Sequence, residues 1–203
     1  MIKLYGNPAS TCTRKVLMTL GETETPFEMN VIDLSKGEHK KDAHVARQPF
    51  GRVPAIDDDG FQLFESRAIM RYLAEKTGSK LLPSDVRARA RMEQWISVET
   101  SEFTIHAMKF VYEHVFKRPQ DPAVLENAGK ALGHTAAVLD KHLASSPFVA
   151  GPDFTLADVT FMPYVEYAMM TPAKEIFAKH THFTKWWSTI SARPTWRKAI
   201  GKG

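Results

Sequence analysis

Apolar positions in the first third of the chain indicate two strands with a helix between them. Residues 2–5, with the sequence Ile-Lys-Leu-Tyr, predict a short buried strand. From Ser10 onward, apolar and small residues recur at positions 13, 16, 17 and 20, the spacing of one helix face. Gly21 and Pro26 are expected to end this helix, and alternation over residues 27–32 predicts a second strand. The pattern is that of a βαβ unit with a right-handed crossover.

A polar stretch and a hairpin follow. Residues 34–52 are mostly polar, with a short helix expected near residues 41–46. Two strand-like runs over residues 53–56 and 61–64 flank a turn at Asp57–Gly60, whose Asp-Gly pair supplies the positive φ that tight hairpins need.

Pro54 cannot donate a hydrogen bond within a sheet, so it is expected at an edge or in a special geometry such as a cis peptide bond. Glu65 and Ser66 then open a helix that ends near Gly78. The first part of the chain therefore reads β-α-β, an irregular segment, β-β and α.

The remainder of the chain has helical periodicity. Residues 78–85 have linker composition, and long helices are expected over 86–117 and 123–143. Thr155 and Asp158 have the spacing of a capping box at the start of a third helix. Shorter helices are expected after Pro172, near 183–190 and after Pro194.

Composition narrows the class of protein. The chain has 203 residues, of which 43% are apolar and 25% charged, as is typical of a folded globular protein. Its single cysteine, Cys12, excludes an intrachain disulfide framework and a multi-thiolate zinc site. No apolar run approaches the roughly 20 residues that span a bilayer, and no apolar signal-peptide core opens the chain. We therefore expect a cytoplasmic protein with no membrane partner.

The net charge of +4 does not by itself indicate a nucleic-acid partner, because basic and acidic residues are interspersed. The densest basic stretch, residues 193–202, contains Trp196 and Ile200 at helical spacing. We interpret it as a short terminal helix that buries these two side chains, since no nucleic-acid motif accompanies it.

Four local strings resemble the phi class of the cytosolic glutathione transferases, and a fifth, from the helical part of the chain, is similar to the capping element of the family's helical domain. They are Lys3-Leu4-Tyr5-Gly6 with Pro8-Ala9-Ser10, Gly37-Glu38-His39-Lys40, Pro49-Phe50-Gly51-Arg52-Val53-Pro54, Leu63-Phe64-Glu65-Ser66-Arg67-Ala68-Ile69 and Phe154-Thr155-Leu156-Ala157-Asp158. The resemblance covers the whole chain. It implies an α/β thioredoxin-like N-terminal domain (1–79), a linker (80–86) and an all-α C-terminal domain (87–203). It further implies a homodimer, glutathione as co-substrate and no metal.

The resemblance assigns catalysis to Ser10, between the first strand and the first helix. A hydroxyl donor and a helix N-terminus can together supply the roughly 2.7 kcal/mol needed to lower a thiol pKa by about two units. The sequence alone allows a second interpretation, in which Ser10 only caps the helix. Cys12, two residues further on, is interpreted as an inert buried thiol, with a low-pKa nucleophile as the alternative.

Seven other residues would bind glutathione in the family. His39 and Lys40 would bind its glycyl carboxylate. Without the resemblance, these two residues would be interpreted as part of a solvated, charged loop. Arg52 stands where the family usually has glutamine, so it would either contact the same carboxylate or turn to solvent. The remaining four divide between two parts of the ligand: Val53 and a cis Pro54 would present backbone to the cysteinyl unit, and Glu65 and Ser66 would hold the γ-glutamyl end.

Ser66 also has a purely structural interpretation, as the residue that caps its helix. Phe50 would insert into a second subunit and anchor the dimer. Phe103, His106 and Phe110 could line an apolar acceptor pocket, although helical spacing alone more often indicates core.

The expected function is conjugation of the glutathione thiolate to apolar electrophiles in detoxification. One alternative is a glutathione-dependent peroxidase or thiol-disulfide reductase that uses Cys12. The other is a non-catalytic ligand-binding or assembly protein of the same fold.

Overall fold

The computed structural model describes residues 1–202, which form two compact units. One unit contains Met1–Leu82 and the segment that starts at Arg193, and the other contains Pro83–Ala192. The boundary after Leu82 lies inside the predicted linker. The segment from Arg193 was predicted to belong to the helical domain, and here the prediction was wrong. It joins the first unit because Arg193 and Thr195 both bind Glu22.

A four-stranded mixed sheet forms the centre of the first unit, with strand order β2-β1-β3-β4. The strands are β1 (Ile2–Gly6), β2 (Phe27–Val31), β3 (Ala55–Asp58) and β4 (Phe61–Phe64). β1 is parallel to β2 and antiparallel to β3, and β3 is antiparallel to β4. Four strands are present as predicted, although the third begins at Ala55 and not at Val53, and the thioredoxin-like fold class is confirmed.

The hairpin between β3 and β4 is tighter than expected. Asp57 and Asp58 belong to β3, and the turn consists of Asp59 (φ 50°) and Gly60 (φ 96°). Asp58 is buried because Tyr72 and Lys76 both donate hydrogen bonds to its carboxylate. These donors stabilise the ionised form, with Lys76 as the largest cause, and hold the pKa of Asp58 below its usual value.

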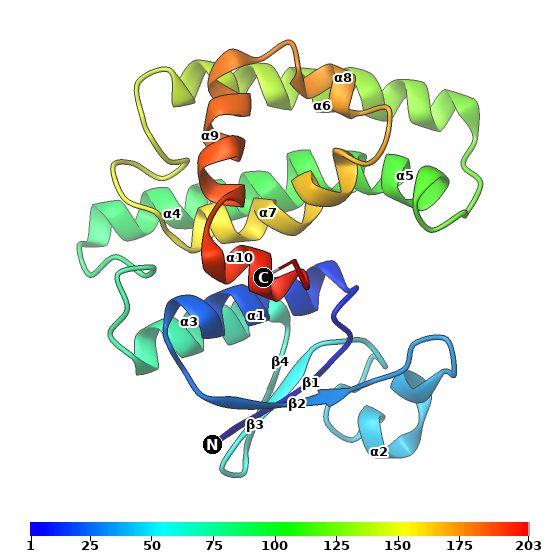
Figure 1. Ribbon diagram of the computed structural model, residues 1–203, viewed down its shortest axis with the longest axis vertical. Helices are drawn as coiled ribbons and strands as arrows, with labels where there is room; N and C mark the ends of the chain where they lie inside the picture. Colours follow the sequence, from blue (N-terminus) through cyan, green and yellow to red (C-terminus); the bar gives the residue numbers. More distant parts are fainter. Residues whose placement is uncertain (203) are drawn as a thin grey trace. The chain divides into compact units, whose positions relative to one another are not determined.

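Two helices of the first unit pack against each other on the sheet, namely α1 (Thr11–Glu22) and α3 (Ser66–Lys76) (Figure 1). Their apolar faces meet the sheet in one core cluster, whose fully buried members include Leu4, Val16, Ile56, Ile69 and Leu73. Burial of each such side chain contributes about 1.5–3 kcal/mol. Three shorter elements complete the unit: a 3₁₀ turn (Glu38–Lys40), α2 (Asp42–Val45) and α10 (Pro194–Ala199). α10 buries Trp196 and leaves Ile200 half-buried, close to the prediction.

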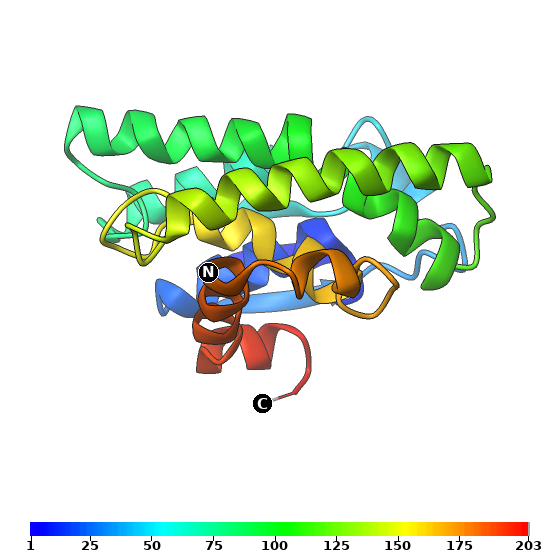
Figure 2. The same ribbon diagram turned by 90° about the horizontal axis from the view of Figure 1, so that it is seen from above.

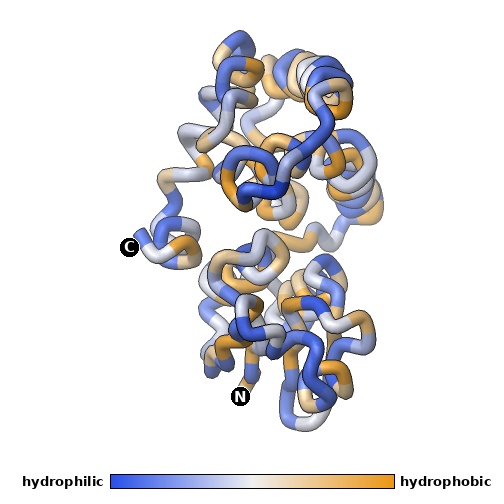
Figure 3. Tube along the Cα trace, turned by 90° about the vertical axis from the view of Figure 1, so that its right-hand side faces the viewer, coloured by the Kyte–Doolittle hydropathy of each residue, from blue (hydrophilic) through white to orange (hydrophobic). Residues whose placement is uncertain are grey.

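The second unit is all-helical. Its elements are α4 (Val86–Val98), a π-helix (Glu99–Thr104), α5 (Ile105–His114), α6 (Pro122–Leu143), α7 (Leu156–Ala168), α8 (Lys174–Phe177) and α9 (Thr181–Ser191). The π-helix interrupts the single helix predicted over residues 86–117. Figure 2 shows the long helix α6 beside α5, and Figure 3 shows polar and apolar positions alternating along the helices. None of the helices within residues 1–202 is long and apolar enough to span a bilayer.

The central helix of this unit, α7, starts at the predicted capping box. The Thr155 side chain caps the helix, and the Thr155 amide donates to the Asp158 carboxylate at 3.0 Å. Asp158 is fully buried and also accepts from the Val149 amide and the Trp186 indole. Burial raises its pKa to about 6, because the low-dielectric surroundings disfavour the charged form.

Candidate functional site

The strand register gathers the predicted site segments at one end of the sheet. Tyr5 lies opposite Ala55, Ala55 lies opposite Phe64, and Gly6 lies opposite Val31. The residues that follow β1, β2 and β4 therefore share an edge with those that precede β3, at the end where α2 lies in Figure 1. Four strands at about 4.8 Å spacing give an edge of roughly 14 Å, long enough for an extended tripeptide of about 10 Å.

Ser10 is the N-cap of α1. Its Oγ accepts a hydrogen bond from the Thr13 amide at 3.3 Å, and its own amide donates to the Asn7 carbonyl at 2.8 Å. Because the hydroxyl acts as an acceptor here, its hydrogen can still be donated to another group. The first turn of α1 has no acidic residue, so the partial positive charge of the helix end is not neutralised by its own side chains. Cys12 is half-buried in the same turn.

Sequence reasoning missed Asn7, which fixes the turn before Ser10. Its Nδ2 donates to the Ile32 carbonyl at 3.0 Å, and its Oδ1 accepts from the Ala9 amide at 3.0 Å. Asn7 thus ties the approach to α1 to the end of β2. An asparagine in a turn next to proline was the available signal.

The N-terminus of α3 differs from the prediction in one respect. Glu65, not Ser66, occupies the N-cap position, and its side chain makes no capping hydrogen bond. Glu65 has φ 70° and ψ 110°, a backbone conformation that residues other than glycine rarely adopt. Ser66 is the buried first residue of the helix. The amides of the first turn of α3 therefore lack a side-chain cap, and an anion could take that place.

His39 and Lys40 lie in the 3₁₀ turn after β2. Lys40 Nζ donates to the Phe50 carbonyl at 3.2 Å, which leaves two of its three N–H groups for a further acceptor. His39 is half-buried, and its Nδ1 has no hydrogen-bond partner within residues 1–202. This loop therefore offers two nitrogen-bearing side chains beside the segment that precedes β3.

The Val53–Pro54 peptide bond is cis, as expected. The backbone N–H and C=O of Val53 make no hydrogen bond within the described part of the chain. The exposed Arg52 side chain also lacks a partner there, whereas its backbone is held on both sides by His44 and Gln48.

The remaining predicted residues lie in different surroundings. Phe50 is 64% exposed and its ring meets Phe64 edge-on, with 6.2 Å between the ring centroids. Phe103 is fully buried against Phe161 and Phe177, so it packs in the core of the helical unit and presents no surface to an acceptor. This differs from its predicted role in an acceptor pocket. His106 and Phe110 are half-buried and lie one turn apart on α5.

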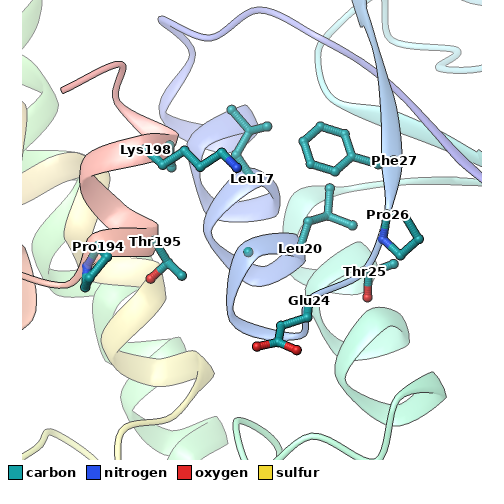
Figure 4. Close-up of a pocket in the computed structure, with 11 residues that line it drawn as sticks. Leu17, Leu20, Glu24, Thr25, Pro26, Phe27, Pro194, Thr195 and Lys198 are labelled. Carbon is teal, nitrogen blue, oxygen red and sulfur yellow. The ribbon is translucent and has the colours of Figure 1, made fainter. Parts of the chain in front are cut away.

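A separate pocket of about 670 Å³ lies at the other end of α1 (Figure 4). Leu17 and Leu20 of α1, Phe27 at the start of β2 and Lys198 of α10 line part of it. Leu20 is ten residues after Ser10 along α1, or about 15 Å at 1.5 Å per residue. This pocket therefore does not belong to the site at the sheet end.

The fold and the site together define a two-unit α/β and all-α protein that can receive an extended peptide at the end of its sheet. Residues 1–75 match the family model for the glutathione S-transferase N-terminal domain, and residues 103–194 match the model for its C-terminal domain. The chain is 39% identical over 208 residues to glutathione S-transferase F12 of Arabidopsis thaliana, covering 98% of this chain and 97% of that protein.

Solved structures agree with this match. Glutathione transferase F2 from Populus trichocarpa superposes with a TM-score of 0.95 at 36% identity, covering 99% of this chain and 98% of that one. Glutathione S-transferase I from mais, in complex with an atrazine glutathione conjugate, gives a TM-score of 0.92 at 28% identity. This match covers 99% of this chain and 97% of that one. The chain belongs to the glutathione S-transferase family and is a glutathione transferase, with phi-like relatives as the resemblance predicted.

Proposed function

We propose that this enzyme is a serine-type glutathione transferase, in which Ser10 donates a hydrogen bond to the glutathione thiolate. The observation that carries the proposal is the position of Ser10 at the N-cap of α1, with its Oγ accepting from the Thr13 amide. In that arrangement the hydroxyl hydrogen and the positive end of the helix both favour a sulfur anion. Ser10 stabilises the nucleophile and does not form a covalent intermediate.

Glutathione lies extended along the sheet end in this proposal. The unpaired backbone of Val53, next to Pro54, binds the cysteinyl unit as an added strand would. At one end, Ser66 and the uncapped amides of α3 hold the γ-glutamyl carboxylate, and Glu65 accepts from the ligand ammonium.

Three basic side chains serve the other end of glutathione. His39 and Lys40 bind the glycyl carboxylate, and Arg52 adds a charge-assisted contact to the same group. Arg52 is suited to this role because its exposed guanidinium has no partner within residues 1–202.

The thiolate attacks an electrophilic carbon of an apolar acceptor, and the leaving group departs with the electron pair of the broken bond. The enzyme contributes orientation, a lowered thiol pKa and an environment poor in water. The conjugate named for the mais relative supports an aromatic electrophile as the acceptor class. We further propose a cytoplasmic homodimer anchored by Phe50, whose exposed ring suits insertion into a partner.

The substitution Ser10→Ala tests the proposed role. We expect glutathione affinity within about twofold, while the conjugation rate with chlorodinitrobenzene at pH 7 falls roughly 10- to 100-fold, the effect of one hydrogen bond to a charged group. The pH at which turnover rises should move toward about 8.5, the pKa of an unassisted thiol. Thr11→Ala, which removes the neighbouring hydroxyl, is the matched control and should keep the wild-type profile. A Ser10→Ala enzyme with unchanged rate and pH profile would overturn the assignment.

Cys12 supports a second candidate, a glutathione-dependent peroxidase or thiol-disulfide reductase, because the thiol is half-buried in the same helical turn as the Ser10 cap. Cys12→Ser should abolish turnover of a hydroperoxide or a mixed disulfide if the thiol takes part. If instead conjugation and peroxide turnover both survive in Cys12→Ser, the thiol has no catalytic role.

A further inference from the structure

Two buried side chains, one in α2 and one shortly after it, bind the backbone of Arg52. His44 lies within α2, and Gln48 follows one helical turn later. His44 Nε2 lies 2.6 Å from the Arg52 carbonyl oxygen, and Gln48 Oε1 accepts from the Arg52 amide at 2.9 Å. Because a carbonyl can only accept, Nε2 carries the hydrogen of this bond. Both backbone polar groups of Arg52 are thus held by side chains, one from α2 and one from the segment just after it.

This clamp acts next to the site. Arg52 directly precedes Val53, whose own backbone groups have no partner in the described chain. The strand β3 begins only at Ala55, so sheet hydrogen bonds do not fix Arg52 or Val53. The Arg52 side chain is exposed and makes no hydrogen bond or ion pair within residues 1–202. The position of the Val53 backbone therefore depends on the two bonds that hold Arg52.

We propose that His44 and Gln48 are positioning residues for glutathione, which act by fixing Arg52 so that the Val53 N–H and C=O are held in place for the cysteinyl unit. This inference rests on the proposed function of Val53. It assigns neither residue a contact with the ligand or with the reacting sulfur. Its consequence is a split in the kinetics: loss of the clamp weakens glutathione binding and leaves the chemical step at saturating glutathione nearly intact.

Additional contacts show why this segment needs a clamp on Arg52 in particular. The Gly51 amide donates to the Gln48 carbonyl at 2.9 Å, and Lys40 binds the Phe50 carbonyl. The residues before Arg52 are therefore anchored already. If the clamp were lost, the chain would be free between Gly51 and the start of β3, and that interval contains Val53.

The test compares variants that remove one bond with a variant that restores it. His44→Leu removes the donor and keeps an apolar side chain of similar bulk, whereas His44→Gln places an N–H near the position of Nε2. Gln48→Met removes the acceptor for the Arg52 amide at nearly constant length. The control is Asp58→Asn, which breaks a buried polar cluster at the opposite end of the same sheet.

Four quantities are measured on the intact enzyme: the glutathione Kd by calorimetry, kcat at saturating glutathione, the melting temperature, and amide hydrogen exchange over residues 50–53. We expect His44→Leu and Gln48→Met to raise the Kd about tenfold, the effect of one broken buried hydrogen bond, with kcat within about twofold. Exchange over residues 50–53 should be faster in both variants. His44→Gln should restore the Kd to within about threefold of wild type.

The proposal is overturned if Asp58→Asn raises the Kd as much as His44→Leu at an equal loss of melting temperature, because the effect would then reflect stability alone. Unchanged Kd and unchanged exchange in Gln48→Met would overturn it as well, even if His44→Leu failed to fold. Failure of the proposed function has a different signature: wild type itself would not bind glutathione, or Ser10→Ala would be fully active. Wild type that binds no glutathione also removes the positioning role.

Discussion

Glu22 joins the end of α1 to the C-terminal segment, and its removal gives a quantitative test of that connection. Its carboxylate accepts two hydrogen bonds from Arg193, at 2.9 and 2.6 Å, and one from Thr195 Oγ1. The substitution Glu22→Gln keeps the volume but removes the charge and one acceptor oxygen. We expect it to weaken the docking of α10 on α1 without disturbing the helical unit.

The magnitude follows from the burial of the pair. The Glu22 side chain is 12% exposed and that of Arg193 is 34% exposed. Hydrogen bonds to charged groups contribute about 1.5–3 kcal/mol when buried, whereas exposed ion pairs contribute about 0.2–1 kcal/mol. A two-bond pair with one largely buried partner should therefore contribute about 2 kcal/mol. For a chain of this size that loss lowers the melting temperature by roughly 4–8 °C.

A double-mutant cycle with Arg193→Gln isolates the pair. Denaturant unfolding of the wild type, both single variants and the double variant should give a coupling free energy of about 1.5–2 kcal/mol. Tryptic cleavage after Arg197 or Lys198, within α10, reports local opening and should be about 30-fold faster in Glu22→Gln. A coupling below about 0.5 kcal/mol, or cleavage at the wild-type rate, would refute the reasoning.

Two further predictions concern the sheet unit. Asp58→Asn should lower the free energy of unfolding at pH 7. Because the pKa of Asp58 is lowered in the folded state, its stabilising contribution is present above the unfolded pKa near 3.8 and is lost as the pH falls. The difference in melting temperature between wild type and variant should therefore disappear below about pH 4. Gly51→Ala should weaken glutathione binding. Gly51 has φ 59°, and an added Cβ would lie 2.9 Å from the His39 carbonyl oxygen. Calorimetry measures the glutathione affinity, and a variant with wild-type affinity would contradict the prediction.

Local sequence signals predicted the elements that depend on neighbouring residues. The Thr155–Asp158 capping box and the positive φ of the Asp59–Gly60 turn both appear in the structure, because each is decided within four residues. The same is true of Ser10 as a helix cap, since its hydroxyl needs only the amide of Thr13. The catalytic interpretation of Ser10 came instead from the family resemblance, which the comparisons support at the level of the family.

Contacts between distant residues account for the parts that were not predicted. The C-terminal segment joins the first unit through Arg193 and Glu22, which are 171 positions apart, and no local pattern reports such a pairing. Asp58 was predicted to lie in the turn because the stretch Asp57–Gly60 has turn composition. It belongs to β3 instead, and its hydrogen-bond partners Tyr72 and Lys76 lie on α3. The clamp formed by His44 and Gln48 was missed for the same reason: its target is a backbone, which has no signature in the sequence.

Glu65 shows how backbone geometry and proposed chemistry meet in one residue. Between the end of β4 at Phe64 and the start of α3 at Ser66 there is one residue to redirect the chain, and it adopts φ 70°. Such a conformation costs a residue other than glycine about 1–3 kcal/mol, so glycine would serve better if turning the chain were the only requirement. The Glu65 carboxylate does not stabilise the fold within residues 1–202, because it caps no amide and forms no ion pair there. A ligand ammonium at this position would account for both the strain and the unpaired carboxylate.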